Sequence, residues 1–187
     1  AIGMIPRHFF LDSAFDRIAY EDRAFPIAAN QTISQPYTVA YQTQLLKVKK
    51  GDKVLEIGTG SMYQTTILAA MGAEVYTIER QEALASRTNQ YIFKEQFPNV
   101  RFFFGDGFLG LPQYAPFDKI IITAAAPNVP EKLWEQLKVR GIMVIPVDES
   151  ETAQRMLRLT KKKDGLAKQE SFEEFSFVPM LQGKSQG

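Results

Sequence analysis

The chain has 187 residues, of which 45% are hydrophobic, and its 22 basic and 21 acidic residues give a formal net charge of +1. This length predicts a single domain over residues 1–187 with one well-buried core. The near-neutral charge provides no electrostatic footprint for nucleic acid or an anionic membrane, so we expect neither as a partner. With no cysteine and only one histidine, His8, the composition excludes disulfides and argues against a metal site or a serine–histidine triad.

The start of the chain, AIGMIPRHFF, lacks the charged and apolar regions of a secretion signal, and no stretch approaches the roughly 18 apolar residues of a spanning helix. We therefore expect a cytoplasmic protein. Separately, we expect it to act as a monomer.

The predicted elements begin after an irregular N-terminal segment, residues 1–36, which has scattered aromatics and turn formers without periodicity. A helix is predicted from Pro36 to Leu46. Within the expected cofactor-binding core, residues 37–147, short β-branched runs alternate with longer helix-like segments, a pattern typical of a parallel sheet covered by helices on both faces. The predicted strands are 54–57, 74–78, 100–104, 119–123 and 142–146, and the predicted helices are 62–71, 81–96 and 130–137.

The last part of the chain, residues 148–187, has a different pattern. Residues 154–161 and 170–178 alternate apolar with polar side chains, and Asp164-Gly165 lies between them as a turn signal. These features predict an antiparallel hairpin on the edge of the sheet.

A glycine-containing turn comes after the first predicted strand of the core. Val54 to Ile57 runs into Gly58-Thr59-Gly60-Ser61 and then into a helix, and glycines in this context let a ligand approach the backbone closely. Glu79 ends the next strand, about 20 residues after the first glycine, where a carboxylate can accept two hydrogen bonds from a ribose diol. Loop and acid together predict a nucleoside-containing cofactor, whereas the loop alone is equally compatible with a structural turn.

The residues directly after the glycines indicate the type of cofactor. A dinucleotide-binding loop reads GxGxxG, with a third glycine that lets the helix pack closely beside a pyrophosphate. Here Met62 and Tyr63 stand in that region. S-adenosylmethionine has no phosphate, and its methionine end can be bound by loop amides, by Ser61 and by Glu56 in the strand. The pattern therefore favours S-adenosylmethionine over NAD.

A third acidic position supports this interpretation. Gly105-Asp106-Gly107 comes after the third predicted strand, which places Asp106 at the carboxyl edge of the sheet where ligands of such folds bind. There Asp106 could accept a hydrogen bond from an adenine amino group.

Several segments resemble the ordered motifs of protein-L-isoaspartate O-methyltransferases, and the resemblance covers nearly the whole chain. VLEIGTGSMYQTTILA, VYTIER, FFGDG, PFDKIIITAAAP and LKVRGIMVIPV match the cofactor-binding part, whereas IPRHFF and NQTISQPY resemble the substrate region peculiar to that family. The resemblance implies an α/β fold of the Rossmann-like class I methyltransferase type, with a doubly wound, mostly parallel sheet and a C-terminal antiparallel hairpin.

The resemblance also implies a reaction. The enzyme would transfer a methyl group from S-adenosylmethionine to the α-carboxylate of L-isoaspartyl residues in damaged proteins and peptides, leaving S-adenosylhomocysteine, and the ester would then cyclise to a succinimide without the enzyme. Ser34 in TISQP matches the active-site serine of the family. The implied cofactor-binding residues are Gln31, Thr32, Glu56, Gly58, Thr59, Gly60, Ser61, Glu79, Arg80, Asp106, Gly107 and Thr123, and the implied substrate-binding residues are Ile33, Ser34, Gln35 and Val178.

Two departures from the family pattern lead to further expectations. Met62 replaces a glycine at the helix start, and we expect it to adopt ordinary helical geometry rather than a positive φ. The family usually has another helix before PRH, whereas this chain begins at Ala1. We expect a truncated or processed chain that lacks part of the cofactor lid.

Two other functions remain open from the sequence. A class I methyltransferase acting on a small molecule or RNA would keep the cofactor motifs but not TISQP. A cofactor-binding module with impaired catalysis would be consistent with Met62 and the short start.

Overall fold

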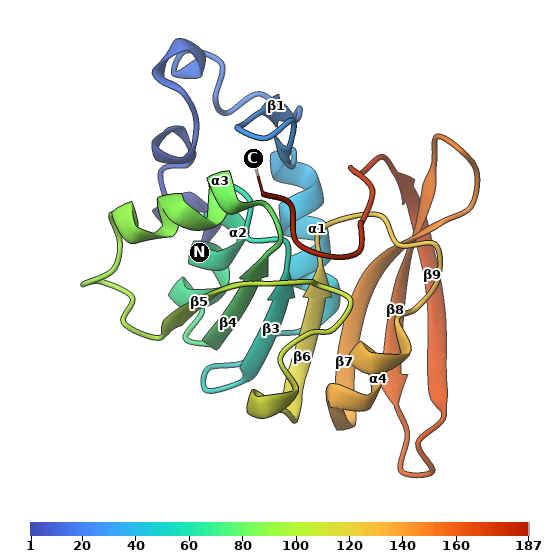
Figure 1. Ribbon diagram of the computed structural model, residues 1–187. Helices are drawn as coiled ribbons and strands as arrows, with labels where there is room; N and C mark the ends of the chain where they lie inside the picture. The colour runs from blue at the N-terminus through green and yellow to red at the C-terminus, as the bar shows by residue number, and fades with distance from the viewer. Residues whose placement is uncertain (187) are drawn as a thin grey trace.

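The structure, a computed structural model, describes residues 1–186 and is built around one twisted sheet (Figure 1). The strands of this sheet are β3 (Lys53–Ile57), β4 (Glu74–Glu79), β5 (Val100–Phe104), β6 (Phe117–Ile122), β7 (Leu137–Asp148), β8 (Gln154–Lys161) and β9 (Ala167–Phe175). Their spatial order is β5-β4-β3-β6-β7-β8-β9. The strands from β5 to β7 are parallel to their neighbours, and β8 and β9 add antiparallel pairs. The predicted parallel sheet and edge hairpin are confirmed.

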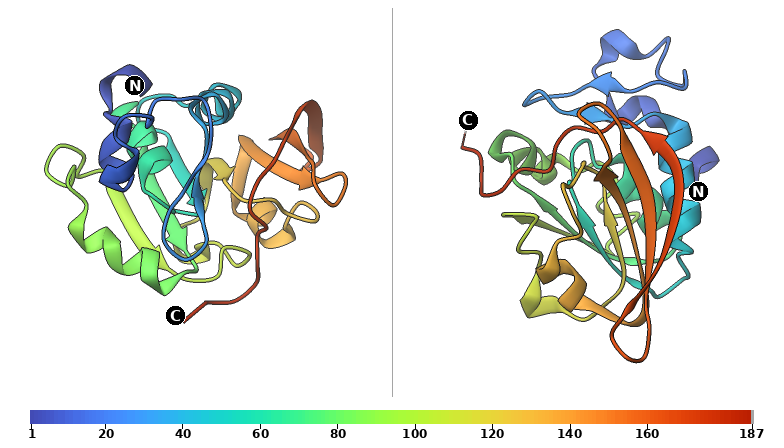
Figure 2. Two further views of the ribbon diagram at one scale, coloured as in Figure 1. Left: turned by 90° about the horizontal axis from the view of Figure 1, so that it is seen from above. Right: turned by 90° about the vertical axis from the view of Figure 1, so that its right-hand side faces the viewer.

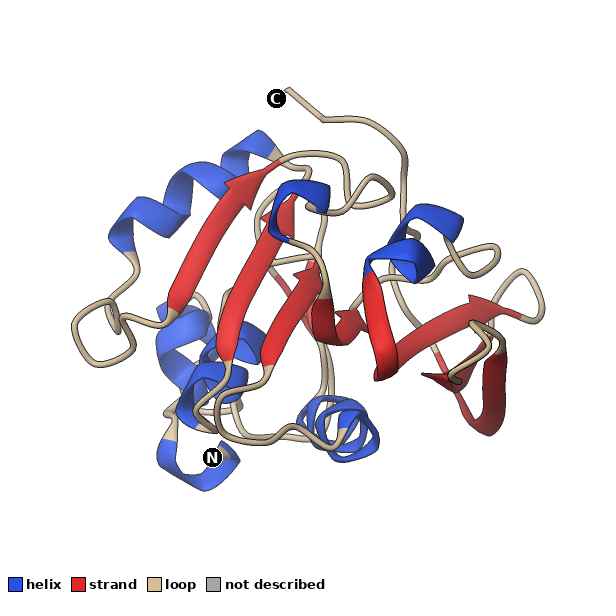
Figure 3. Cartoon of the chain, turned by 90° about the horizontal axis from the view of Figure 1, so that it is seen from below, coloured by secondary structure: helices blue, strands red, loops and turns tan. Residues whose placement is uncertain are grey.

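The buried parallel strands explain the hydrophobic runs of the sequence, because helices and loops cover both faces (Figure 3). Side chains alternate between the faces, so Leu55 and Val54 of β3 belong to different apolar clusters. On the Val54 face the sheet is covered by α1 (Pro36–Leu46) and α2 (Tyr63–Ala70), through residues such as Leu46 and Leu68. On the Leu55 face, α4 (Glu131–Gln136) contributes Leu133.

The strand order reverses direction between β3 and β6, since the chain moves outward from β3 to β5 and then returns to β6 on the other side. Ligands of open α/β sheets bind in the crevice outside the carboxyl ends of the strands at such a switch point. In Figure 1 these ends point upward, toward the N-terminal segment and the C-terminal tail.

The N-terminal segment has little regular structure and lies over this upper edge (Figure 2). It contains three single-turn helices, η1 (Ile2–Met4), η2 (Arg7–Phe10) and η3 (Ser13–Phe15), and then a two-residue ribbon of β1 (Phe25–Pro26) and β2 (Thr32–Ile33). Buried Ile5, Phe25 and Ile33 pack this segment against Ile67 of α2. The ribbon thereby holds the chain just before Ser34 in a fixed position.

Some predicted boundaries are wrong. The predicted helix 81–96 is shorter: it consists of α3 (Glu82–Ala85) and η4 (Ser86–Gln90), after which Tyr91 leaves the helix and is buried in the core. The strand predicted at 142–146 extends over twelve residues as β7, and the second hairpin strand is 167–175 instead of 170–178. Among residues 1–186, no helix has the length and apolar character needed to span a bilayer.

Candidate active site

The glycine turn after β3 forms the centre of the candidate site. Gly58 has φ of 95°, and a Cβ atom there would lie 2.7 Å from Oγ1 of Thr123. Thr123, directly after β6, donates a hydrogen bond from this hydroxyl to the carbonyl oxygens of Ile57 and Gly58, at 3.0 and 2.9 Å. Only glycine combines this backbone conformation with such close contact. The residue directly after the neighbouring strand β6 therefore holds the loop in place.

Glu79, at the end of β4, supports the same loop. Its Oε2 accepts a hydrogen bond from the amide of Gly60 at 2.9 Å, and Oε1 accepts from the amide of Gln81 at 2.8 Å. Each carboxylate oxygen retains a lone pair that can accept from a ribose hydroxyl. The acid predicted to bind ribose thus also positions the loop, a second role that the sequence spacing does not reveal.

Two adjoining cavities surround the loop and share Thr32, Gly58, Gly60 and Thr123. We call the first the Glu79 cavity: its other residues are Gln31, Ile57, Ile78, Glu79, Arg80, Gly107, Ala124 and residues 178–181. The second, the Ser34 cavity, also contains Ile33, Ser34, Val39, Gln42, Thr59, Ser61, Tyr63 and Gln64. Ten of the predicted cofactor residues and three of the four predicted substrate residues therefore line one cavity or the other.

Three predicted site residues lie outside both cavities. Gln35 stands at the start of α1, where its backbone carbonyl accepts from Val39. Glu56 is completely buried beneath the loop, and its Oε2 accepts a hydrogen bond from Thr65 of α2 at 2.5 Å. Asp106 accepts hydrogen bonds from the backbone amides of Phe108 and Gly183, both at 2.8 Å. Direct ligand contact by these side chains stays a prediction; the contacts seen are structural.

Burial determines the charge of Glu56. Desolvation raises the pKa of this carboxyl to about 8, against the opposing effect of hydrogen bonds from Thr65 and Thr77; the negative charge of Glu79 raises it further. Glu56 is therefore mostly protonated at neutral pH. As a neutral acid it stabilises the junction of β3 and α2 rather than adding a negative charge to the site.

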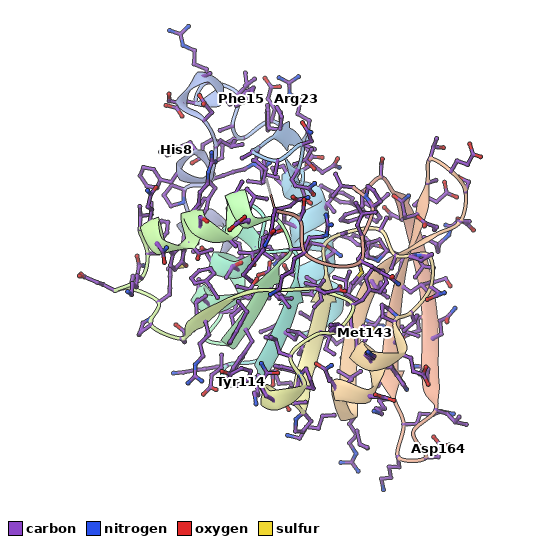
Figure 4. All side chains as sticks on the ribbon, in the orientation of Figure 1. His8, Phe15, Arg23, Tyr114, Met143 and Asp164 are labelled. Carbon is purple, nitrogen blue, oxygen red and sulfur yellow. The ribbon has the colours of Figure 1, made fainter. Side chains whose placement is uncertain are left out.

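His8 also lies away from the two cavities. Its Nδ1 is 2.7 Å from the hydroxyl oxygen of Tyr20 within the N-terminal segment. In Figure 4 His8 lies in this segment, with Phe15 and Arg23 higher in the view, whereas Asp164 marks the hairpin tip at the opposite end of the sheet. His8 therefore packs within the N-terminal segment, against Phe9 and Tyr20.

The C-terminal tail, residues 178–186, crosses the upper edge of the sheet over the Glu79 cavity (Figure 1). Arg80 donates hydrogen bonds to the carbonyl oxygens of Gly183 and Gln182, at 3.0 and 3.4 Å. Asp106 accepts from Gly183, and the Ser185 amide donates to the Arg80 carbonyl. The cavity under the tail has a volume of about 70 Å³, whereas small-molecule pockets measure about 300–1,000 Å³. We therefore expect the tail to shift when a ligand of nucleoside size binds.

Replacing Arg80 with alanine should release this tail locally. Two hydrogen bonds to tail carbonyls would be lost, and we expect the Ser185 amide to exchange with solvent deuterium about tenfold faster, since each 1.4 kcal/mol corresponds to a factor of ten. Native-state hydrogen exchange of the unliganded protein measures this rate. Arg87→Ala, at an exposed position on η4, is the matched control and should leave this rate unchanged. Equal exchange rates in the two variants would show that the Arg80 hydrogen bonds do not hold the tail in place.

Met62 differs from expectation. The predicted helical geometry is wrong, because Met62 has φ of 70° and ψ of 6° and caps α2 without a side-chain hydrogen bond. A residue with a Cβ atom in this left-handed region is strained by about 1–2 kcal/mol. Its side chain packs beside the buried Tyr63 and Ile67 cluster. Packing thus offsets part of the strain.

A pair of variants separates strain from packing. Met62→Gly and Met62→Ala both remove the side chain, but only glycine removes the strain. We expect the glycine variant to be more stable than the alanine variant by about 1 kcal/mol in urea unfolding. Equal stabilities would mean that the left-handed conformation at Met62 carries no measurable cost.

The site also contains residues that the sequence motifs did not indicate, chiefly Gln42, Gln64, Met180 and Leu181. Gln42 lies in α1 and Gln64 in α2, and nothing in their sequence spacing distinguishes them from core-packing positions. Met180 and Leu181 come after a strand of the hairpin, and only the return of the tail to Ala125 places them at the site.

The donors and acceptors present fit S-adenosylmethionine. Glu79 offers carboxylate oxygens for a ribose, and the absence of a Cβ at Gly58 and Gly60 lets a ligand lie against the loop. In the Ser34 cavity, hydroxyl and carboxamide groups can bind the zwitterionic methionine end. A doubly wound sheet with this loop, this acid and no third loop glycine defines a class I S-adenosylmethionine-dependent methyltransferase.

Comparison with known proteins gives the family. The model of the protein-L-isoaspartate(D-aspartate) O-methyltransferase family matches residues 1–185, and the chain belongs to this family. The protein-L-isoaspartate O-methyltransferase of Christiangramia forsetii is 53% identical over 185 residues, which are 99% of this chain and 86% of that protein. The namesake enzyme of Gloeobacter violaceus is 45% identical over 186 residues, which cover 100% and 90%.

Comparison with solved structures points to the same family. A protein-L-isoaspartate O-methyltransferase superposes with a TM-score of 0.84 at 28% identity; the match covers 94% of this chain but 58% of that longer one. A Plasmodium falciparum protein described as the same enzyme, in complex with S-adenosyl-L-homocysteine, gives a TM-score of 0.79 at 25% identity and covers 94% and 85%. The family and cofactor expected from the sequence are confirmed.

Proposed function

We propose that Ser34 orients the α-carboxylate of an L-isoaspartyl residue beside the glycine loop, where the carboxylate is methylated in the reaction of this family. The observation that supports this role is the Ser34 cavity itself, which Ser34 shares with Gly58, Gly60 and Ser61. A group held by the Ser34 hydroxyl there lies next to the expected methionine end of the cofactor. Small-molecule or RNA methylation is not favoured, because the relatives named above carry the isoaspartyl activity in their names.

S-adenosylmethionine, when bound, supplies an electrophilic methyl group on its sulfonium. The chain itself supplies position and exclusion of water. A carboxylate is already ionised at neutral pH, so no general base is required, and alignment can lower the barrier by several kcal/mol. Ser34 comes after the buried Ile33 and precedes Pro36, the first residue of α1, so its backbone is held on both sides.

We place the peptide where the two cavities adjoin, between Ile33 of the Ser34 cavity and Val178 of the Glu79 cavity. Val178 lines the Glu79 cavity, and its carbonyl accepts a hydrogen bond from the Ala125 amide at 2.8 Å. The tail thus covers the cofactor on one side and faces the peptide on the other. We also propose that the protein acts as a monomer in the cytoplasm.

The test is a radiolabelled methyl-transfer assay with an isoaspartyl peptide and its normal aspartyl twin. We expect label only in the isoaspartyl peptide. Equal labelling of the isoaspartyl and aspartyl peptides would contradict the proposed substrate. Labelling of RNA instead would support a different methyltransferase. The molar mass from light scattering tests whether the protein is a monomer in solution.

A further inference from the structure

Gln64, on the first turn of α2, is a buried side chain whose arrangement the family motifs leave unexplained. It is 8% exposed, lines the Ser34 cavity, and its Oε1 is buried without a hydrogen-bond partner in the described part of the chain. A buried acceptor without a partner costs about 1–3 kcal/mol, so proteins rarely leave one unless a ligand or solvent meets it.

The orientation of the Gln64 carboxamide is determined by its neighbour. Thr43 of α1 donates its only hydroxyl hydrogen to the carbonyl oxygen of Val39 at 2.7 Å. Its oxygen can therefore act only as an acceptor toward Gln64, and the Gln64 Nε2 donates to it at 2.9 Å. This contact excludes the flipped carboxamide, so it is the acceptor oxygen that remains for a ligand.

The ligand group that meets Oε1 must be a donor. The isoaspartyl carboxylate and the carboxylate of the cofactor are acceptors only, and they would repel this oxygen. The remaining candidates are an amide hydrogen of the peptide and the ammonium of the methionine moiety. Of the proposed substrate residues only Ile33 and Ser34 line this cavity, whereas Gly58, Gly60 and Ser61 of the cofactor loop line it and lead directly into α2, the helix that carries Gln64.

The cavity carries no charge that could pair with the ammonium. The residues that line it are all uncharged, and Glu56, the nearest acid in the sequence to the loop, lies buried outside it. An ammonium bound there relies on neutral oxygens, of which the Gly58 carbonyl already accepts from Thr123. Gln64 Oε1 is buried and has no partner in the described part of the chain, so it is free to accept from the ammonium.

We propose that Gln64 binds the α-ammonium group of the methionine moiety of S-adenosylmethionine, with Thr43 holding its carboxamide in the required orientation. The inference rests on the proposed placement of the cofactor in the Ser34 cavity. It adds a binding residue on α2 to a site otherwise built from loops and strand ends.

Calorimetry with two ligands tests this proposal: S-adenosylhomocysteine, and its analogue in which hydrogen replaces the α-amino group. The variant is Gln64→Met, which keeps the side-chain volume and removes the acceptor. We expect it to bind S-adenosylhomocysteine about 10- to 100-fold more weakly, the range for a hydrogen bond to a charged group, and to bind the deaminated analogue like the wild type within about threefold.

Thr66→Val is the matched control, because Thr66 is a buried hydroxyl on α2 whose bonds go to Tyr91 and to Met62 rather than to the cavity. It should leave the ratio of the two affinities unchanged. Equal weakening of both ligands by Gln64→Met, or no weakening of either, would overturn the proposal. If Ser61→Ala, on the cofactor loop of the same cavity, weakened S-adenosylhomocysteine but Gln64→Met did not, only the role of Gln64 would be wrong; if neither variant weakened it, the placement of the cofactor in the Ser34 cavity would be wrong.

Discussion

Ser34→Ala should lower kcat for methylation of an isoaspartyl peptide by roughly 100-fold, the usual effect of removing one hydrogen-bond donor aligned on a reacting oxygen. The Kd for S-adenosylhomocysteine should change less than about twofold, because the Ser34 hydroxyl is assigned to the carboxylate of the peptide. Single-turnover kinetics at saturating cofactor, together with calorimetry, separate the two effects.

Ser61→Ala provides the contrasting variant. Ser61 lies in the same cavity but on the cofactor loop, and its removal should weaken S-adenosylhomocysteine binding while kcat at saturating cofactor stays close to that of the wild type. If Ser34→Ala weakened the cofactor and left kcat unchanged, Ser34 would belong to the cofactor site and the proposed alignment of the carboxylate would be wrong.

The second large effect concerns the buried Glu56. Its pKa is about 8 in the folded protein, against an ordinary value of 4.5. At a pH between these two pKa values, the folded protein keeps a proton on Glu56 that the unfolded chain has released. The free energy of unfolding therefore falls as pH rises. The stabilisation by the protonated carboxyl is complete below pH 4.5 and is lost progressively up to about pH 8. At 1.36 kcal/mol per pKa unit, the loss is on the order of 4 kcal/mol between pH 5 and pH 8.

Glu56→Gln replaces the protonated acid with a neutral side chain of the same shape and should remove this dependence. Urea unfolding at pH 5 and pH 8 measures it: the stability of the wild type relative to Glu56→Gln should decline with pH. Glu74→Gln, an exposed position at the start of β4, is the control and should behave like the wild type. A wild-type curve parallel to that of Glu56→Gln would show that Glu56 is ionised in the folded protein at neutral pH.

The parts of the fold that were predictable are those where local pattern and tertiary packing agree. Buried strands such as β3 are short, mainly apolar runs, and β3 ends just before Gly58, so its position is visible in the sequence. The segment 81–96 has a helical composition, but the burial of Tyr91 and its hydrogen-bond contact with Thr66 pull the chain away from the helix after Gln90. Tertiary packing overrides helix propensity there.

The same contrast applies to the site. Gly58 and Glu79 were found because their roles depend on position along one strand and the turn after it. The positive φ at Met62 was missed because methionine alone indicates a helix, and only the geometry of the loop imposes the left-handed conformation. The role assigned to Gln64 depends on a contact with Thr43, 21 residues away in the chain, which no local pattern encodes.

The most direct test of the account is a crystal structure with S-adenosylhomocysteine and an isoaspartyl peptide. The account predicts the ribose hydroxyls on Glu79, the sulfur between Gly58 and Ser34, and the peptide carboxylate within hydrogen-bond distance of the Ser34 hydroxyl. A larger hollow of about 610 Å³ lies on the other side of the loop, between Phe9 and Tyr91. If the cofactor were found there, away from Ser34 and Glu79, the assignment of the active site would be contradicted.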